Sequence, residues 1–427
     1  DNIFLTDGWV SDNDFDINVY ASQATVTFHK TINDKQLAKS LTFYPDKHII
    51  DISIDASSIQ RWVSQDVLTL SWRGGLPLTE PNKKDEQIYY QAMLYQGDET
   101  YAPKAKPHTQ AKLERMDYPT DWVAIRTKYF ISALVPEDQS PGSEVLAVEE
   151  SGNTRYDVGI HFSAGRPFQT ALYIGPLEYN RIKRLGKNLD QIMNFGWAFI
   201  RPISKAVHWC LLFLYTYIPN YGFVLLVFSV LVKILVYPLT AKSYSSTKKM
   251  QAIQPLLNEL KEKHKNDQRK FAQAQMDLFK KHGVNPLSGC VPILLQMPLL
   301  FALFTVFRSS IELRGAPFIL WIGDLSRPDA VFDLGINIPL YGNQVAILPI
   351  LMGITMFLQM KSMPTSQSGA QQKYMMYFMN GFFVLIFNQF PSGLVLYYTL
   401  FNILTVLQQN YLTPQTTAEG VLSKSSG

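Results

Sequence analysis

Five long apolar segments fill the second half of the 427-residue chain, at 221–239, 289–307, 345–360, 374–390 and 393–412. A helix needs about 20 apolar residues to cross the roughly 30 Å hydrocarbon layer of a bilayer, and tilt allows some variation. Each segment comes close to that length, the third being the shortest. The chain is therefore expected to form an α-helical polytopic membrane bundle with five core spans at 221–412.

The first 180 residues follow a different pattern, in which apolar and polar residues alternate. Ile50, Ile52 and Ile54, for example, are separated by Asp51 and Ser53. A period of two is typical of strands with one face in water, and turn-rich stretches separate the runs. We predict an all-β sandwich domain at 1–180. Because a fold alone supplies no function, a spacer without a site of its own is one interpretation of this domain.

The segment between the first two apolar runs carries ten Lys or Arg residues and four Asp or Glu residues. The positive-inside rule places it in the cytoplasm, which puts the β-domain and 308–344 outside and 361–373 and the tail 413–427 inside. Apolar residues recur at helical spacing in two stripes, which predicts a cytoplasmic helical hairpin at 241–285 with its turn at 266–267. The hairpin is either a connector or a docking surface for a ribosome, lipid headgroups or partner helices.

A basic amphipathic helix is predicted at 191–218, just before the first span. Arg201, Lys205 and His208 fall on one face, and Trp197 and Trp209 are among the apolar positions. This composition is typical of a helix that lies in the headgroup plane of a membrane. A soluble helix packed on the β-domain is the alternative.

One charged side chain, Lys233, lies within a predicted span. A charge at mid-bilayer costs roughly 2.5 to 3.5 kcal/mol on insertion scales, so such a residue marks a candidate functional site. Lys233 is about 9 Å of helix from the cytoplasmic end of its span, and extension of the side chain to the interface is the competing explanation. Ser229 shares its helix face, and the other spans carry polar residues, several at helical spacing: Gln296, Thr355, Gln359, Asn380, Asn388, Tyr398, Asn402 and Thr405.

Such polar groups rarely face lipid, so we predict that they converge on a hydrophilic groove inside the bundle. Hydrogen bonds that merely join helices, worth about 0.6 kcal/mol each, are the alternative. The seven histidines fall outside the spans and no Asp lies within one, which argues against intramembrane hydrolase chemistry. No metal or cofactor is expected, the net charge of +4 is too small to indicate nucleic-acid binding, and a solute channel or transporter is the rival function.

Short sequence strings are spread over most of the chain: DWVA at 121–124, LYIGP at 172–176, VYPLT at 236–240, NPL at 285–287, LQMP at 295–298, ELR at 312–314, APF at 316–318, FPSGL at 390–394 and YY at 397–398. With these strings the chain resembles the YidC/Oxa/Albino family of membrane-protein insertases, in the form found in bacteria with an outer membrane. The resemblance implies that Asp1 falls partway into that family's periplasmic domain and that the sandwich is shortened at its start.

The resemblance implies a non-enzymatic insertase of the bacterial inner membrane. Its expected partners are nascent membrane proteins, the lipid bilayer, the ribosome, the signal recognition particle and its receptor, and the Sec translocon, with no sequence-specific nucleic acid. Lys233 stands where the family usually has an arginine, Ile386 where an aromatic residue is familiar, and Asn380 where proline is usual. Unlike arginine, a buried lysine can lose its proton. The predicted substrate-binding residues are Ser229, Lys233, Gln296, Thr355, Ile386, Tyr397, Tyr398 and Asn402.

Overall fold

The computed structural model describes residues 15–32, 34–103, 111–150, 153–193, 195–265, 267–283, 291–362 and 370–412. The chain divides into two compact units, of which the first ends at Asn194 and the second begins at Phe195. This division comes after the predicted boundary at residue 180, because two short helical segments pack on the β-rich unit. They are α2 (Tyr179–Arg184) and the 3-10 turn η3 (Leu189–Ile192). The Arg126 guanidinium, for example, donates a hydrogen bond of 2.5 Å to the Ile192 carbonyl.

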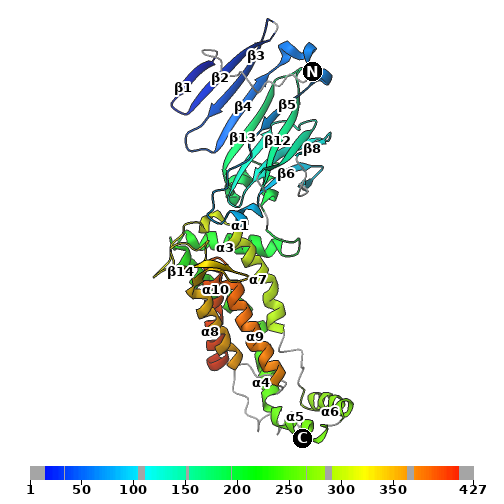
Figure 1. Ribbon diagram of the computed structural model, residues 1–427, viewed down its shortest axis with the longest axis vertical. Helices are drawn as coiled ribbons and strands as arrows, with labels where there is room; N and C mark the ends of the chain where they lie inside the picture. Colours follow the sequence, from blue (N-terminus) through cyan, green and yellow to red (C-terminus); the bar gives the residue numbers. More distant parts are fainter. Residues whose placement is uncertain are drawn as a thin grey trace. The chain divides into compact units, whose positions relative to one another are not determined.

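The first unit contains two antiparallel sheets (Figure 1). Within the described residues, one sheet has nine strands and the other has four. The larger sheet has the order β1 (Phe15–Tyr20), β2 (Gln23–Ile32), β3 (Lys35–Phe43), β4 (Ile49–Asp55), β13 (Phe168–Pro176), β10 (Phe130–Pro136), β9 (Thr120–Arg126), β6 (Gln91–Gln96) and β7 (Glu99–Tyr101). The smaller has the order β5 (Val67–Trp72), β12 (Asn153–Ser163), β11 (Ser143–Glu150) and β8 (Ala111–Met116). Short helical segments connect them at η1 (Ser57–Trp62), η2 (Ser64–Asp66) and α1 (Lys83–Gln87).

One apolar core joins the two sheets. It combines Ile52 and Ile54 from β4 with Val158, Ile160 and Phe162 from β12. Ile52 and Ile54 belong to the run whose alternation predicted a strand, and Asp51 within that run is exposed. The prediction of a β-sheet domain is confirmed.

Glu144 on β11 lies between His161 on β12 and Arg115 on β8, whose Nε2 and Nε atoms are 3.7 and 3.4 Å from its carboxylate. The imidazole, aided by the Arg115 charge, holds the pKa of Glu144 below its ordinary value, although burial acts in the opposite direction. Such a carboxylate stabilises the folded state above its unfolded pKa of about 4.3, and this contribution disappears as the pH falls through the lowered folded pKa.

We expect Glu144→Gln to lower the free energy of unfolding of the β-domain at neutral pH and to have little effect below the lowered pKa of Glu144. Urea unfolding of the wild type and the variant at pH 7 and at successively lower pH values measures this difference. A destabilisation that does not diminish as the pH falls would contradict the assignment, since it would not depend on the charge of the carboxylate.

The second unit is helical. Helices overlap all five predicted spans, and α10 is the most deeply buried of them, with Tyr397 and Thr405 fully enclosed. The apolar core of this unit includes residues from α3, α4, α7, α8, α9 and α10. The elements are α3 (Arg201–Tyr215), α4 (Tyr221–Ala252), α5 (Gln254–Lys263), α6 (Gln268–Lys281), α7 (Val291–Ser309), η5 (Ile311–Leu313), β14 (Ala330–Ile338), β15 (Gly342–Ala346), α8 (Ile347–Ser362), α9 (Ala370–Phe387), α10 (Ser392–Leu407) and η6 (Gln408–Leu412).

The span boundaries differ from the prediction at several points. The first predicted span continues without a break to Ala252, and the third begins at Ile347 rather than at 345 because 342–346 form strand β15. Among the described residues, one helix, Tyr221–Ala241, is long and apolar enough to cross a membrane, while Ile347–Lys361 and Tyr374–Phe387 are shorter apolar helices. The helical character of this half is confirmed, whereas the count of five spans is not.

Helix α3 differs in length and in its faces from the helix predicted at 191–218. His208, placed with Arg201 on the polar face, is instead buried beside Val207 and Leu211. Its Nε2 atom lies 3.4 Å from the carboxylate of Glu312, which gives the imidazole a polar neighbour inside the unit. Trp209 points the other way and is 65% exposed.

Helices α5 and α6 form a pair at the end of α4, away from α7–α10 (Figure 1). Met250, Ile253 and Leu257 from one predicted stripe pack with Phe271 and Leu278 from the other, and with Phe279. The Asp267 side chain caps α6 by accepting a hydrogen bond from the Lys270 amide. Residue 266 of the predicted turn, the 285–287 string and the tail 413–427 lie outside the described residues.

Candidate functional site

Lys233 lies on α4 and is only 8% exposed. Its Nζ atom donates a hydrogen bond of 2.7 Å to Thr405 Oγ1 on α10 and sits 4.6 Å from the centre of the Phe401 ring. Phe401 and Thr405 are four residues apart on one helix, so they share a face and meet the ammonium group together. The side chain is therefore directed into the bundle in this structure, not extended along α4 toward the helix end.

A second polar contact lies one turn away on the same face of α10. Asn402 Nδ2 is 3.5 Å from Thr355 Oγ1 on α8, at the limit of a hydrogen bond. Together, Lys233, Thr355, Asn402 and Thr405 form what we call the polar cluster. It joins three helices, α4, α8 and α10.

Ser229 precedes Lys233 by four residues and is 1% exposed. Its hydroxyl donates to the Leu226 carbonyl of its own helix, 2.8 Å away, so the oxygen also remains able to accept a hydrogen bond. The structure thus places Ser229 on the face that carries Lys233, although its recorded hydrogen bond is local.

Tyr397 and Tyr398 form an aromatic group beside the polar cluster. The Tyr397 ring lies 5.9 Å from both Phe228 and Phe401, and the Tyr398 ring lies 5.7 Å from Phe387. Both hydroxyls are buried and have no hydrogen-bond partner among the described residues. A buried hydroxyl without a partner costs about 1 to 3 kcal/mol, so these two positions are unusually receptive to a polar group.

Two predicted site residues do not join these contacts. Gln296 on α7 and Ile386 on α9 are half-buried, and neither takes part in the hydrogen bonds of the polar cluster. Asn380 donates to the Gly353 carbonyl and so connects α9 with α8. The side chain of Asn380 therefore forms a hydrogen bond that joins two helices. This is the role that was the alternative to a groove for the polar residues of the spans.

Asn388 has a structural role that its sequence position did not reveal. Its Oδ1 accepts from the Ala346 amide at 3.0 Å, and its Nδ2 donates to the carbonyls of Tyr341 and Gln344 at 2.8 and 2.6 Å. The side chain therefore fixes the β14–β15 hairpin to the end of α9, and it is not part of the polar cluster. A sequence without coordinates offers no signal for this pairing, because the partners are backbone groups.

The FPSGL string positions the buried helix α10. The Ser392 amide donates to the Arg327 carbonyl at 2.7 Å, and the Gly393 amide donates to the Leu325 carbonyl at 3.0 Å. A Cβ atom on Gly393 would lie 2.9 Å from the Phe307 ring and 3.1 Å from the Leu325 oxygen. Glycine is required there by this close approach, which sets where Tyr397, Asn402 and Thr405 fall.

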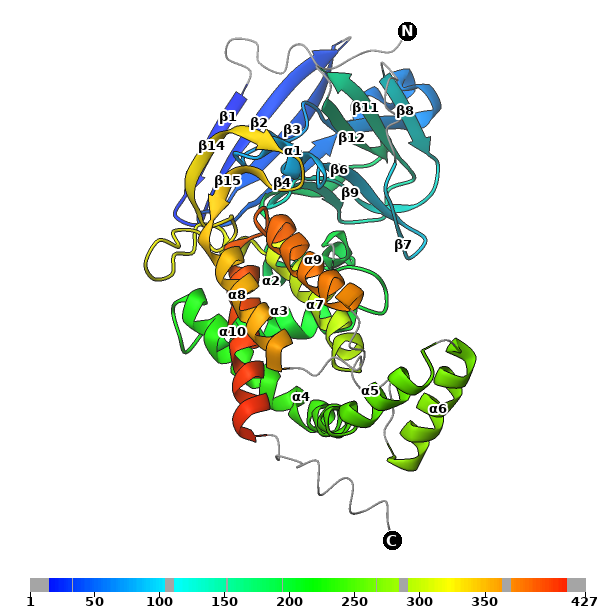
Figure 2. The same cartoon turned by 60° about the horizontal axis from the view of Figure 1, so that its bottom comes forward.

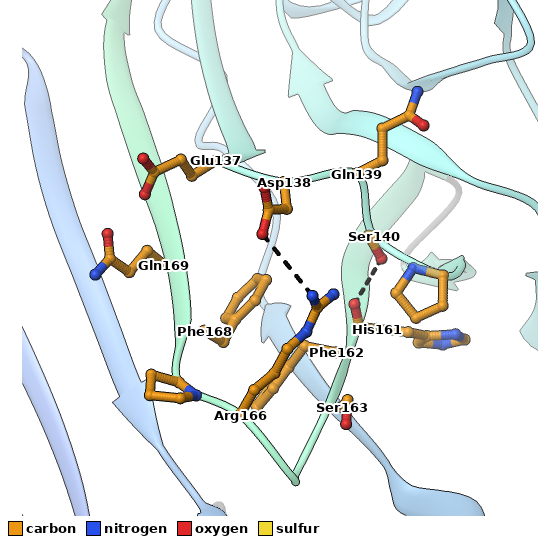
Figure 3. A pocket seen from close by; sticks show the side chains of 12 residues that line it. Glu137, Asp138, Gln139, Ser140, His161, Phe162, Ser163, Arg166, Phe168 and Gln169 are labelled. Carbon is orange, nitrogen blue, oxygen red and sulfur yellow. Dashed lines mark hydrogen bonds and ion pairs between the residues drawn. The ribbon is translucent and has the colours of Figure 1, made fainter.

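The β-domain has a cleft of about 380 Å³ at one end of its strands (Figure 3). Its lining includes Arg166 and Asp138, which face each other at 4.0 Å, and Ser140, whose hydroxyl donates to the His161 carbonyl. Arg166 and Asp138 are largely exposed to solvent. The cleft is therefore a solvent-exposed surface depression between two turns. No group of metal ligands occurs in the described part of the chain.

Comparison with known proteins covers both halves of the chain. The family model for the 60Kd inner membrane protein matches residues 213–419, and that for the YidC periplasmic domain matches residues 7–210. The Membrane protein insertase YidC of Chlorobium luteolum is 40% identical over 388 residues, which are 89% of this chain and 66% of the relative. That of Chlorobium limicola is 39% identical over 410 residues, 93% of this chain and 70% of the relative.

The chain belongs to the YidC family of membrane protein insertases. It spans about two thirds of the length of these curated relatives. The resemblance found in the sequence strings is confirmed. The relatives are named as insertases, in agreement with the predicted non-enzymatic function. This name does not favour the rival function of a solute channel or transporter. The two family models also describe an inner membrane protein and a periplasmic domain, in agreement with the predicted compartment of each half.

Proposed function

We propose that this chain inserts nascent membrane proteins into the bilayer, alone or together with a Sec translocon. The observation that carries the proposal is the burial of Lys233 within an apolar helix, where it is bonded to Thr405 on another helix. A charge in that position has a high cost of burial and is rarely kept for packing alone. The proposed function gives this charge a use, because it can attract the polar segment of a substrate.

The proposed site is a hydrophilic intramembrane groove centred on the polar cluster. Lys233, Thr355 and Asn402 supply donors and acceptors, Ser229 extends the polar face of α4, and the hydroxyls of Tyr397 and Tyr398 adjoin it. Gln296 and Ile386, half-buried on α7 and α9, would contact substrate farther from Lys233. Lysine, unlike arginine, can lose its proton and its charge when it is buried. Water in the groove would favour the charged form of Lys233, so the hydration of the groove would control how strongly the site attracts anions.

The proposed membrane arrangement has five core spans, formed by α4, α7, α8, α9 and α10. The β-domain and the β14–β15 hairpin face the periplasm, while α5, α6 and the tail face the cytoplasm, in keeping with the basic residues of the α5–α6 segment. Helix α3 lies in the outer interface, where its exposed Trp209 and Phe213 would sit among headgroups.

The mechanism involves no covalent step. A short acidic segment of the substrate enters beside Lys233, whose positive charge offsets part of the cost of leaving bulk water. The substrate's apolar segment then moves past the aromatic rings near Tyr397 into lipid, and transfer of its apolar surface drives completion. The exposed lysines of the α5–α6 pair provide a docking surface for the ribosome, the signal recognition particle and its receptor, or anionic lipid headgroups.

Site-specific photocrosslinking to a ribosome-stalled membrane protein tests the function. Probes replacing Ser229 and Tyr398 are expected to crosslink to the nascent chain, because both positions adjoin Lys233 or its aromatic neighbours. A probe at Trp62, exposed in the β-domain, is the control and is expected to give none. Crosslinks from 229 and 398 that involve lipid and never the nascent chain would overturn the proposal.

A further inference from the structure

The β14–β15 hairpin exposes an unusual amount of apolar side chain. In β14 and the turn after it, Phe332 is 64% exposed, Ile336 65% and Leu340 59%. In the sequence, apolar residues at 332, 334, 336 and 338 alternate with Asp333, Gly335 and Asn337. A continuous exposed apolar patch on a folded protein normally marks a surface that contacts something other than water.

The hairpin backbone is anchored at both ends, so its exposed side chains do not stand on a loose loop. Asn388 accepts from the Ala346 amide at the base and donates to the carbonyls of Gln344 in β15 and Tyr341 in the turn, and Gln389 Nε2 donates to the Leu340 carbonyl of the turn at 2.8 Å. At the other side of the base, Asp329 Oδ2 accepts from the amides of Ile347 and Leu348 and from Trp321 Nε1, at 2.8 to 3.1 Å. Its carboxylate thereby caps the N-terminal end of α8.

The apolar surface continues on both sides of the hairpin. Strand β15 leads directly into α8 (Figure 2). Ile350, Ile354 and Leu358 of α8 are exposed, and their spacing of four residues places them on one side of the helix. The loop before β14 adds Ile319 and Leu320, and it is tied to the hairpin by the bond between Trp321 and Asp329. Between 330 and 346 the sequence has one acidic residue, Asp333, and no lysine or arginine.

We propose that the β14–β15 hairpin is immersed in the outer interfacial layer of the membrane, with Phe332, Ile336 and Leu340 in contact with lipid. The proposal rests on the membrane arrangement given under the proposed function, in which the first turn of α8 lies at the outer surface. The exposed apolar side chains of the hairpin continue the lipid-facing side of α8. We therefore expect the hairpin to contact lipid, as α8 does. Immersion by roughly 5 to 10 Å, as for interfacial helices, suffices to cover these side chains.

The test uses an environment-sensitive fluorescent amino acid placed singly at Phe332 or Ile336 in the full chain, reconstituted into vesicles. Lipids that carry a nitroxide near the headgroup are expected to quench both probes more strongly than lipids with the nitroxide near the bilayer centre. Aqueous iodide is expected to quench them weakly. A probe at Asn337, the exposed polar position next to Ile336, is the matched control, and one at Ile354 on α8 is the control for deep burial.

Iodide quenching at 332 and 336 equal to that at 337, without quenching by either lipid, would overturn the proposal. Protection from iodide with no lipid quenching would also overturn it, since it would show that protein covers the hairpin. Insertion activity is measured separately on the same vesicles. Probes in water on active vesicles would disprove only the hairpin's immersion, and probes in lipid on inactive vesicles would disprove only the insertase function.

Discussion

Replacing Lys233 with methionine is expected to slow the insertion of substrates with an acidic translocated segment by roughly tenfold or more. Methionine keeps much of the length and removes the charge and the hydrogen bond to Thr405. Substrates with a neutral translocated segment should be affected much less, because they gain little from a positive charge in the site. Initial rates of protease protection in reconstituted vesicles measure both effects.

Two variants separate charge from packing. Lys233→Arg retains the charge and should preserve the preference for acidic segments. Thr405→Val removes the oxygen that accepts from Nζ and leaves the ammonium in place, so it should also preserve the preference. Insertion of acidic and neutral substrates at the wild-type rate by Lys233→Met would show that the charge has no role in the reaction.

Replacing Trp122 with alanine is expected to have the largest effect on stability, lowering the free energy of unfolding of the β-domain by about 3 to 5 kcal/mol. Trp122 is fully buried, its ring stacks on Tyr95 at 5.8 Å, and its Nε1 donates to the Lys187 carbonyl at 3.0 Å. The substitution therefore creates a cavity and leaves the partly buried Lys187 carbonyl without this donor. Urea unfolding of the full chain, followed by proteolysis of sites in the β-domain, measures the loss.

The matched control is Trp62→Ala, since Trp62 is 45% exposed and should change the free energy of unfolding by about 0.5 kcal/mol or less. Equal destabilisation by the two substitutions would contradict the burial of Trp122. The same preparations show whether the β-domain is needed for insertion, because Trp122→Ala weakens the first unit without altering any residue of the second.

The sequence was most informative where a pattern repeats. The alternation at 50–54 predicted strand β4, and the spacing of Tyr398, Asn402 and Thr405 predicted one face of a helix, because both patterns follow from local backbone geometry. The polar contacts of Lys233 and Asn402 follow from that spacing once α4, α8 and α10 are neighbours. The structure supplied both that neighbourhood and the atoms involved.

Other features depended on contacts that no local pattern contains. Asn388 was grouped with the polar residues of the spans, yet its partners are backbone groups of a distant hairpin. His208 was assigned to a polar face because its residue type is polar, whereas Glu312 provides it with a buried partner. Most of the β14–β15 hairpin falls within 308–344, which was predicted only as an outside segment between spans, and residues 345–346 were assigned to the third span. The apolar alternation of the hairpin is short, and the backbone at Gly335 has a positive φ that a regular strand does not contain.

Pro238 has a mechanical consequence for α4. Proline has no amide hydrogen, so the helix lacks one backbone hydrogen bond five residues after Lys233, where the carbonyl of Ile234 would accept it. We therefore expect α4 to bend most easily near that point. A change of angle there would move α5 and α6 and would leave Lys233, which precedes the bend, nearly in place.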